Sequence, residues 1–309
     1  MAEVFEQVTG FPAAIRELGA RGLIRVTGGD RIHFLNGMLT SEVESLEAGA
    51  VRAALQLDRK GHIRAELWLV VLDEAVLLDA APGAEAALFE TLDKHVIAED
   101  VELERLSGWD QLGIEGPGAS ALETARSPAP GRCEVDARGR LWLAGGSVAG
   151  QGVRVLGERA AIAELRVRLD LPSLSEEAAL VLRIDAFRPA QGVDFGERNF
   201  PQEAGLEDSV SFTKGCFIGQ EIVARIESRG AVNRLLVKLR PETTVARGAE
   251  IRADGKSVGQ VTSAAASAAT GPIALGYVHA ALAEPGTAVE IAGVPASVLP
   301  RSASSRSDK

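Results

Sequence analysis

The stretch Phe212-Thr-Lys-Gly-Cys-Phe-Ile-Gly-Gln-Glu-Ile-Val-Ala-Arg-Ile-Glu-Ser-Arg-Gly230 is the most informative part of this sequence. From about Ile218 onward it predicts a helix, because Ile222 and Ile226 lie four apart on one face while charged residues recur at the same spacing on another. Cys216 lies just ahead of that helix. Unpaired backbone N–H groups and the positive end of the helix dipole favour an anion at such a position.

The residues around this cysteine support a reactive thiol. Lys214 adds a nearby cation, and a cation and a helix N-terminus both favour the thiolate form. Gly215 and Gly219 flank Phe217, so the chain can turn tightly there and approach a ligand closely. A buried cysteine that fills a gap in the core fits the same spacing, since free cysteine is among the most buried residue types. The spacing leaves both interpretations open.

Length and composition narrow the class of protein. A chain of 309 residues favours two or three domains over one. The formal charge of -10 argues against a protein that coats nucleic acid or an anionic membrane. The two cysteines, Cys133 and Cys216, form neither a disulfide framework nor a zinc-binding cluster, which indicates a reducing compartment.

The N-terminus and the apolar segments predict a cytoplasmic protein without membrane contact. Met1-Ala-Glu-Val-Phe-Glu has no apolar run and carries acidic residues, unlike a signal or transit peptide. The apolar stretch Leu67–Leu72 is far shorter than the roughly 20 residues of a membrane helix and reads as a buried strand. The polar segment 301–309 is expected to be disordered.

The order of elements predicts a mixed α+β protein. Strands are expected at 51–57, 63–72 and 75–80 as an antiparallel meander, followed by a helix after Pro82 and a strand at 101–106. Residues 111–118 predict a strand that leads into a helix around 120–125, and 159–169 has the apolar stripe of a second helix. After the cysteine segment, five short strands at 235–239, 257–263, 273–278, 288–292 and 296–299 predict a small barrel or sandwich.

Several segments together resemble one family. Lys214-Gly-Cys-Phe-Ile-Gly-Gln-Glu221 is similar to the KGCYxGQE signature of the YgfZ-type folate-binding proteins, which are relatives of the aminomethyltransferase (T-protein) of the glycine cleavage system. Four further segments support the resemblance, which spans nearly the whole chain: Asp30 to Leu46, Leu57-Asp-Arg-Lys-Gly-His-Ile63, Leu112-Gly-Ile-Glu-Gly-Pro117, and Gly259-Gln-Val-Thr-Ser263 with Ile273-Ala-Leu-Gly-Tyr-Val278.

The resemblance implies a three-domain cloverleaf of the aminomethyltransferase (GcvT) type around a central channel that accepts tetrahydrofolate. The expected division is a discontinuous folate-binding domain at 1–50 and 110–230, an inserted ferredoxin-like α+β domain at 51–109, and a C-terminal β-barrel at 231–300. The segment 301–309 would be a tail.

The resemblance also implies which carboxylates contact folate. The T-protein relatives carry an Asp-Asp pair after the glycine hairpin, and Ala65 and Glu66 stand at the matching positions, which argues against methylene transfer. Leu182-Arg-Ile-Asp185 matches a segment whose acidic residue lies against the pterin ring, and a carboxylate there can accept hydrogen bonds from an amino-pyrimidine edge. Glu66 also fits a solvent-facing strand position, and Asp185 a helix-cap or turn position.

Arginines are the candidates for the glutamate tail of folate, because guanidinium groups bind carboxylates in a fork. These are Arg225, Arg229 and Arg234, of which at least one also fits a surface ion pair with Glu221 or Glu227. The four histidines lie in unlike contexts and are given no metal or catalytic role.

The function implied by the resemblance is a tetrahydrofolate-binding accessory protein that supports maturation or repair of iron–sulfur enzymes. Cys216 would be its functional thiol, and iron–sulfur client or assembly proteins would be its partners, without direct contact to nucleic acid. The remaining signature residues are Lys214, Gly215, Phe217, Gly219, Gln220 and Glu221. The alternatives are a folate-dependent aminomethyl or methyl transferase, with Glu66 or Asp185 near the reacting nitrogens, and a scaffold that has lost its ligand.

Overall fold

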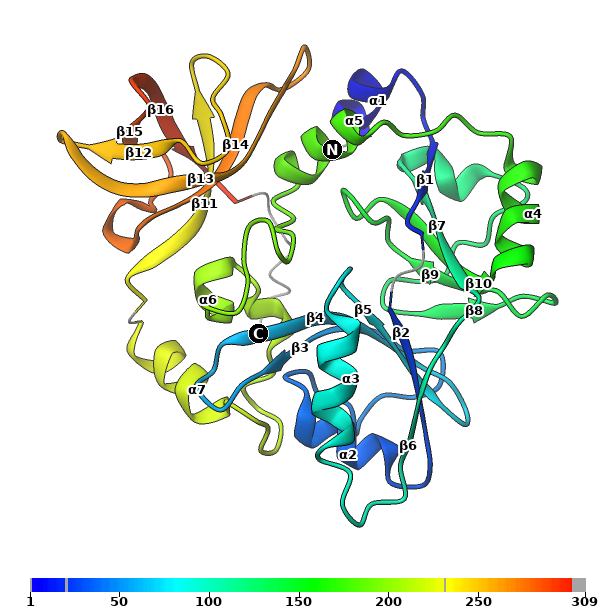
Figure 1. Ribbon diagram of the computed structural model, residues 1–309. Coiled ribbons are helices and arrows are strands. Elements are labelled where there is room, and N and C mark those ends of the chain that lie inside the picture. The colour runs from blue at the N-terminus through cyan, green and yellow to red at the C-terminus, as the bar shows by residue number, and fades with distance from the viewer. Residues whose placement is uncertain (1, 20–21, 231, 302–309) are drawn as a thin grey trace.

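The computed structural model describes residues 2–19, 22–230 and 232–301. Two five-stranded sheets, each with its helices, and a C-terminal barrel are arranged around the segment that holds α5, α6 and the loop between them (Figure 1). This confirms the mixed α+β class and the small C-terminal barrel. It also places residues from all three parts at one junction.

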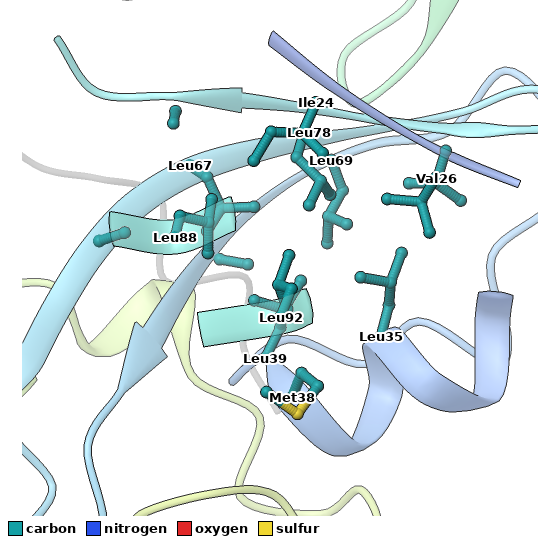
Figure 2. Close-up of a cluster of buried hydrophobic side chains, with 14 of the residues drawn as sticks. Ile24, Val26, Leu35, Met38, Leu39, Leu67, Leu69, Leu78, Leu88 and Leu92 are labelled. Carbon is teal, nitrogen blue, oxygen red and sulfur yellow. The ribbon is translucent and has the colours of Figure 1, made fainter. Parts of the chain in front are cut away.

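The first sheet has the strand order β3-β4-β5-β2-β6, and all of its pairs are antiparallel. Its odd-numbered β4 residues from Ile63 to Leu69 are buried, and helices α2 and α3 cover that face with the core shown in Figure 2. The bounds are β2 (Leu23–Thr27), α2 (Arg31–Met38), β3 (Val51–Leu57), β4 (Ile63–Val71), β5 (Val76–Ala80), α3 (Glu85–Asp93) and β6 (Glu102–Arg105).

The strand pairing differs from the predicted division at residue 50. Strand β2 lies between β5 and β6, and α2 packs on the same sheet, so residues 23–38 join the unit that was expected to begin at 51. Strand β1 (Ala14–Glu17) instead pairs with β7 in the second sheet. The meander is therefore completed by a strand that precedes it in the sequence, a long-range pairing that local periodicity does not show.

The second sheet has the order β1-β7-β10-β9-β8, with α4 packed on it and α1 against α5. In place of the helix expected around 120–125, a short 3-10 turn covers Pro117–Ala121, and the backbone is extended at Leu122 directly after it. The bounds are α1 (Ala2–Thr9), β7 (Trp109–Glu115), the 3-10 turn Pro117–Ala121, β8 (Cys133–Val135), β9 (Leu141–Ala144), β10 (Gly152–Glu158) and α4 (Arg159–Leu169).

A buried ion pair joins the two sheets. Arg154 of β10 donates to Asp79 of β5 at 2.8 Å, and the Gln111 amide of β7 donates to the other carboxylate oxygen at 2.8 Å. The Arg154 guanidinium also lies 4.8 Å from the centre of the Trp68 ring. This polar contact lies at the interface of an otherwise apolar cluster.

The C-terminal strands close into a barrel in the order β11-β14-β13-β12-β15-β16. Five of these strands were predicted, and the sixth is β12, which is only four residues long. The bounds are β11 (Arg234–Pro241), β12 (Glu250–Ala253), β13 (Lys256–Ser267), β14 (Gly271–His279), the 3-10 turn Ala280–Leu282, β15 (Ala288–Ile291) and β16 (Val294–Leu299).

The segment between the second sheet and the barrel supplies the junction. It contains α5 (Glu176–Asp185), α6 (Pro201–Ala204), a 3-10 turn (Glu207–Ser209) and α7 (Gln220–Arg229). Arg301 follows the barrel and packs its guanidinium 5.2 Å from the centre of the Phe187 ring, so the first residue of the expected tail is held by contacts. Residues 302–309, the rest of that tail, lie outside the described residues.

Candidate functional site

The Lys214 side chain fastens the signature loop to the end of helix α2. It is buried, and its Nζ donates to the carbonyl oxygens of Asn36, Leu39 and Ser41 at 2.6, 2.8 and 2.7 Å. Helices end with carbonyl groups that lack intrahelical partners, and a lysine that binds them stabilises the end. The loop is therefore tied to α2 by a side chain as well as by its backbone.

Two backbone hydrogen bonds flank this lysine contact. The Ser211 N–H donates to the Thr40 carbonyl at 2.8 Å, and the Ile218 N–H donates to the Gly37 carbonyl at 3.3 Å. The residues between these two anchors include Cys216.

This geometry changes the role predicted for Lys214. An ammonium group has three N–H donors, and all three are used by carbonyl oxygens. Burial lowers the pKa of Lys214 to about 8. The nearby carboxylates of Glu42 and Glu44 oppose this effect, since they raise the pKa. Lys214 therefore has no N–H donor left for the Cys216 thiolate, because its donors are turned into the protein.

Cys216 is exposed, whereas Cys133 is buried. The interpretation of Cys216 as a core-filling residue is therefore wrong, and it describes Cys133 instead. Helix α7 begins at Gln220, two residues later than Ile218, with Gly219 at its N-cap. Cys216 thus lies outside the first turn, in a loop between buried Lys214 and buried Phe217.

The two glycines of the signature differ in their surroundings. Gly219 has a φ of +86°, and a Cβ there would lie 2.5 Å from the carbonyl oxygen of Asp58 in the β3–β4 hairpin. A Cβ on Gly61 of that hairpin would lie 3.2 Å from Ile222 and from Val223 of α7. Gly215 has no such neighbour within 4 Å and no positive φ. The close contact between the signature loop and the β3–β4 hairpin therefore requires glycine at 219. At 215 neither the backbone nor the space requires a glycine.

Asp185 is the last residue of α5, beside the barrel. Lys238 of β11 donates to its carbonyl oxygen at 2.8 Å and to its carboxylate Oδ1 at 3.5 Å. Its side chain is 22% exposed. The carboxylate is thus partly neutralised by a lysine and still has oxygen lone pairs that face solvent.

Glu66 lies on β4, on the opposite face from Ala65. Ala65 is buried in the core under α2 and α3, so its position offers no room for a charged group facing a ligand. The Glu66 N–H donates to the side-chain oxygen of Gln191 at 2.7 Å, and the Gln191 amide donates to the Arg64 carbonyl at 3.0 Å. The loop that follows α5 therefore holds the strand that carries Glu66.

The three candidate arginines do not form one group. Arg225 and Arg229 are exposed on α7, and neither forms an ion pair with another residue in the described part of the chain. Arg234 pairs with Glu203 at 3.3 Å and lies 5.0 Å from the centre of the Tyr277 ring. The ion pair that the described residues show for this set is thus Arg234 with Glu203 of α6, in place of a pair with Glu221 or Glu227.

Sequence reasoning missed a second polar cluster between the barrel and the loop after α5. Asp194 is fully buried and accepts hydrogen bonds from Thr262 and Ser263 of β13. The nearby Tyr277 hydroxyl is buried without a hydrogen-bond partner among the described residues, and burial, together with the Glu203 and Asp194 charges, raises the pKa of Tyr277. The segment Gly259–Ser263 contained a signal for this cluster, but it suggested only the barrel fold.

Two cavities lie away from these carboxylates. One of about 550 Å³ is lined by Arg234, Lys256 and His279 at one end of the barrel, and one of about 500 Å³ is lined by Trp109 and Cys133 between the two sheets. Glu66, Asp185 and Cys216 line neither.

The described ranges 2–19, 22–230 and 232–301 contain neither a metal-binding cluster nor a membrane-spanning helix. No group of three or more histidine, cysteine, aspartate or glutamate side chains is placed there to hold a metal ion. No helix in those ranges is both long enough and apolar enough to span a membrane.

The polar groups at the junction are of the chemical type that a pterin would need. The Asp185 and Glu66 carboxylates are acceptors on elements that the loop after α5 joins, and the Tyr277 hydroxyl is an unused polar group on the barrel. Amino and ring N–H groups of a pterin require such acceptors. They come from the first sheet, from helix α5 and from the barrel.

Comparisons with known proteins identify the domains of the chain. Residues 12–155 match the GCVT N-terminal domain family, and residues 234–302 match the glycine cleavage T-protein C-terminal barrel domain. An aminomethyltransferase of Streptomyces coelicolor is 30% identical over 307 residues, which cover 89% of this chain and 80% of the relative. The tRNA-modifying protein YgfZ of Yersinia pestis is 26% identical over 245 residues, 74% of this chain and 71% of the relative.

The fold has a solved counterpart. The crystal structure of the glycine cleavage system aminomethyltransferase T from Bartonella henselae superimposes with a TM-score of 0.84 at 23% sequence identity, over 97% of this chain and 88% of that one. The GcvT-type domains at both ends of the chain, the signature around Cys216 and the YgfZ relatives together show that this chain belongs to the GcvT-like family as a protein of the YgfZ type.

Proposed function

We propose that this protein binds tetrahydrofolate, or a one-carbon derivative of it, and supports the maturation or repair of iron–sulfur enzymes through the Cys216 thiol. Its partners are then a folate and the iron–sulfur client or assembly proteins. We also propose a cytoplasmic location.

One observation carries the proposal. Cys216 is exposed in a loop that three hydrogen bonds from Lys214 and two from the backbone hold against α2. An ordered, exposed thiol can meet a group on another macromolecule, whereas a buried one cannot. The thiol then acts by redox exchange or as a transient ligand, since a cluster needs more than one cysteine.

We propose Asp185 and Glu66 as the contacts for the pterin ring. Arg225 and Arg229 remain the proposed contacts for the glutamate tail. Their exposure on α7 requires that the tail run along the outside of that helix.

The test compares Cys216→Ser with the matched control Cys133→Ser in a strain that lacks the gene for this protein. We expect Cys216→Ser to bind 5-formyl-tetrahydrofolate as the wild type does but to lose iron–sulfur enzyme activity in cells. Cys133→Ser should keep both properties. Full restoration of that activity by Cys216→Ser would refute the role of the thiol, and wild-type protein that binds no folate would refute the cofactor.

A folate-dependent transferase is the second candidate, because a relative 30% identical to this chain is named an aminomethyltransferase. The buried alanine at 65 disfavours it, since the aspartate that the resemblance expects there is missing. Turnover of an aminomethyl or methyl donor with tetrahydrofolate by purified protein, lost in Asp185→Ala, would favour this candidate over the first.

A further inference from the structure

Strand β13 has a bulge where it faces the loop after α5. Its pairing with β14 shifts register between Val261 and Ser263, so Thr262 is the extra residue. Neighbouring residues of a regular strand point to opposite faces, and a bulge changes this. Here Thr262 Oγ1 and Ser263 Oγ both donate to Oδ1 of Asp194, each at 2.6 Å.

The other oxygen of the Asp194 carboxylate is held by the α5 side of the junction. Oδ2 accepts from the Ala190 N–H at 2.9 Å and from the Arg183 guanidinium. Arg183 also donates to Ser263 Oγ at 2.7 Å. The buried carboxylate is thus neutralised by one arginine and joins the barrel, helix α5 and the loop 188–195.

Helix α5 carries one of the proposed pterin contacts, Asp185, and the loop 188–195 binds the strand that carries the other, Glu66. Arg183 lies two residues before Asp185 in the last turn of α5, and Lys238 of β11 caps that turn at the Asp185 carbonyl. Gln191, three residues before Asp194, accepts from the Glu66 N–H. Apolar contacts between α5 and the barrel surround these bonds.

We infer that Asp194 is a positioning residue that docks the barrel onto loop 188–195 and α5 and thereby sets where the Asp185 and Glu66 carboxylates lie. The docking role of Asp194 does not depend on the proposed folate site. Its effect on folate affinity rests on that proposal. Folate affinity then depends on the Thr262 and Ser263 hydroxyls, although the resemblance assigns them no contact with the ligand.

The test removes the two hydroxyls in a Thr262→Val, Ser263→Ala double variant. Thr262→Ser keeps the hydroxyl as a conservative control, and Ser267→Ala removes a hydroxyl of the same strand that contacts Thr270 instead. In the double variant we expect hydrogen exchange at the Glu66 and Ala190 amides to be faster by about tenfold or more, with exchange at Val155 in the second sheet unchanged. Both controls should exchange as the wild type does.

The dissociation constant for 5-formyl-tetrahydrofolate is measured on the same proteins. We expect it to rise by about tenfold in the double variant and to stay unchanged in Thr262→Ser. Unchanged exchange at Glu66 and Ala190 in the double variant would overturn the inference, whether or not the wild type binds folate. Accelerated exchange with unchanged affinity would overturn its link to the ligand, and absence of folate binding by the wild type would refute the proposed function alone.

Discussion

At the residue scale, Lys214 is a signature residue whose side chain holds the loop in place and makes no hydrogen bond to the neighbouring thiol. Its three hydrogen bonds to the end of α2 leave no donor for the neighbouring thiol. A buried cation with satisfied donors is costly to disturb, because removing one partner leaves polar groups unpaired. The role that the geometry gives Lys214 is therefore to anchor the loop that carries Cys216.

Replacement of Lys214 by methionine tests this role. We expect Lys214→Met to lower the free energy of unfolding by about 2–4 kcal/mol, because three buried carbonyl oxygens lose their donor. Lys60→Met, at an exposed lysine of the adjacent hairpin, should change it by less than about 0.5 kcal/mol. Urea unfolding measures both, and equal stability of the two variants would contradict the anchoring role.

The two glycines of the signature form a matched pair. Gly219→Ala should cost about 2 kcal/mol or more, since the residue has a positive φ and its Cβ would clash with the Asp58 carbonyl. Gly215→Ala should lie within about 0.5 kcal/mol of the wild type, because its Cβ enters open space. Denaturant midpoints of the two variants decide this, and a tolerated alanine at 219 would speak against the close contact between Gly219 and the hairpin.

The sequence allowed the signature to be recognised but not the directions of its side chains. Spacing placed Cys216 next to Lys214 along the chain, yet the lysine turns inward and the cysteine outward. Asp194 escaped notice because the hydroxyl groups that bind it are 68 and 69 residues away in sequence. Local patterns carry no information on which distant hydroxyls meet a buried acid.

At the element scale, regular periodicity was the reliable guide. Helix α4 covers residues 159–169 as predicted, and the three meander strands were found near their predicted bounds. Short elements were missed or misjudged, among them β1, β2, β12 and the turn that begins at Pro117. Their form depends on pairing and packing with residues that are remote in the sequence.

The β8–β9 hairpin provides a prediction on pH. Burial alone would raise the pKa of Asp136, but hydrogen bonds from Trp142, Arg140 and the Arg138 backbone lower it from 3.8 to about 2. A carboxyl whose pKa is depressed on folding adds stability above its unfolded pKa and loses it as the pH falls through the folded value. Asp136→Asn should therefore cost about 2 kcal/mol at pH 7.

That difference should shrink as the pH falls from about 4 to 2, the window between the unfolded and folded pKa values of Asp136. Urea unfolding of wild type and Asp136→Asn across this range measures it. A constant difference down to pH 2 would mean that the hydrogen bonds do not depend on the charge of Asp136.

At the scale of the whole molecule, buried polar contacts add to the apolar clusters that join the parts of the fold. The Asp79–Arg154 pair joins the two sheets, and the Asp194 cluster joins the barrel to α5. The family resemblance anticipated three units. Only the strand pairing shows that β1 belongs to the second sheet while β2, which follows it in sequence, belongs to the first. Binding at the junction would depend on all of these contacts together.

The pair between the sheets gives a prediction at this scale. Asp79→Ala should lower the free energy of unfolding by about 3–5 kcal/mol, because it leaves the Arg154 charge buried without this carboxylate. Adding Arg154→Met should recover part of that loss, since both charges are then gone. Guanidinium unfolding of the single and double variants measures this, and a double variant as unstable as the summed singles would argue against coupling.

The opposite exposure of the two cysteines has a practical consequence. Native protein should take up one maleimide per chain, at Cys216, and unfolded protein two. A photoactivatable probe attached there would sample whatever docks on the signature loop in cell extract. The chain thus has a native attachment point for identifying molecules that bind near the signature loop, without any engineered residue.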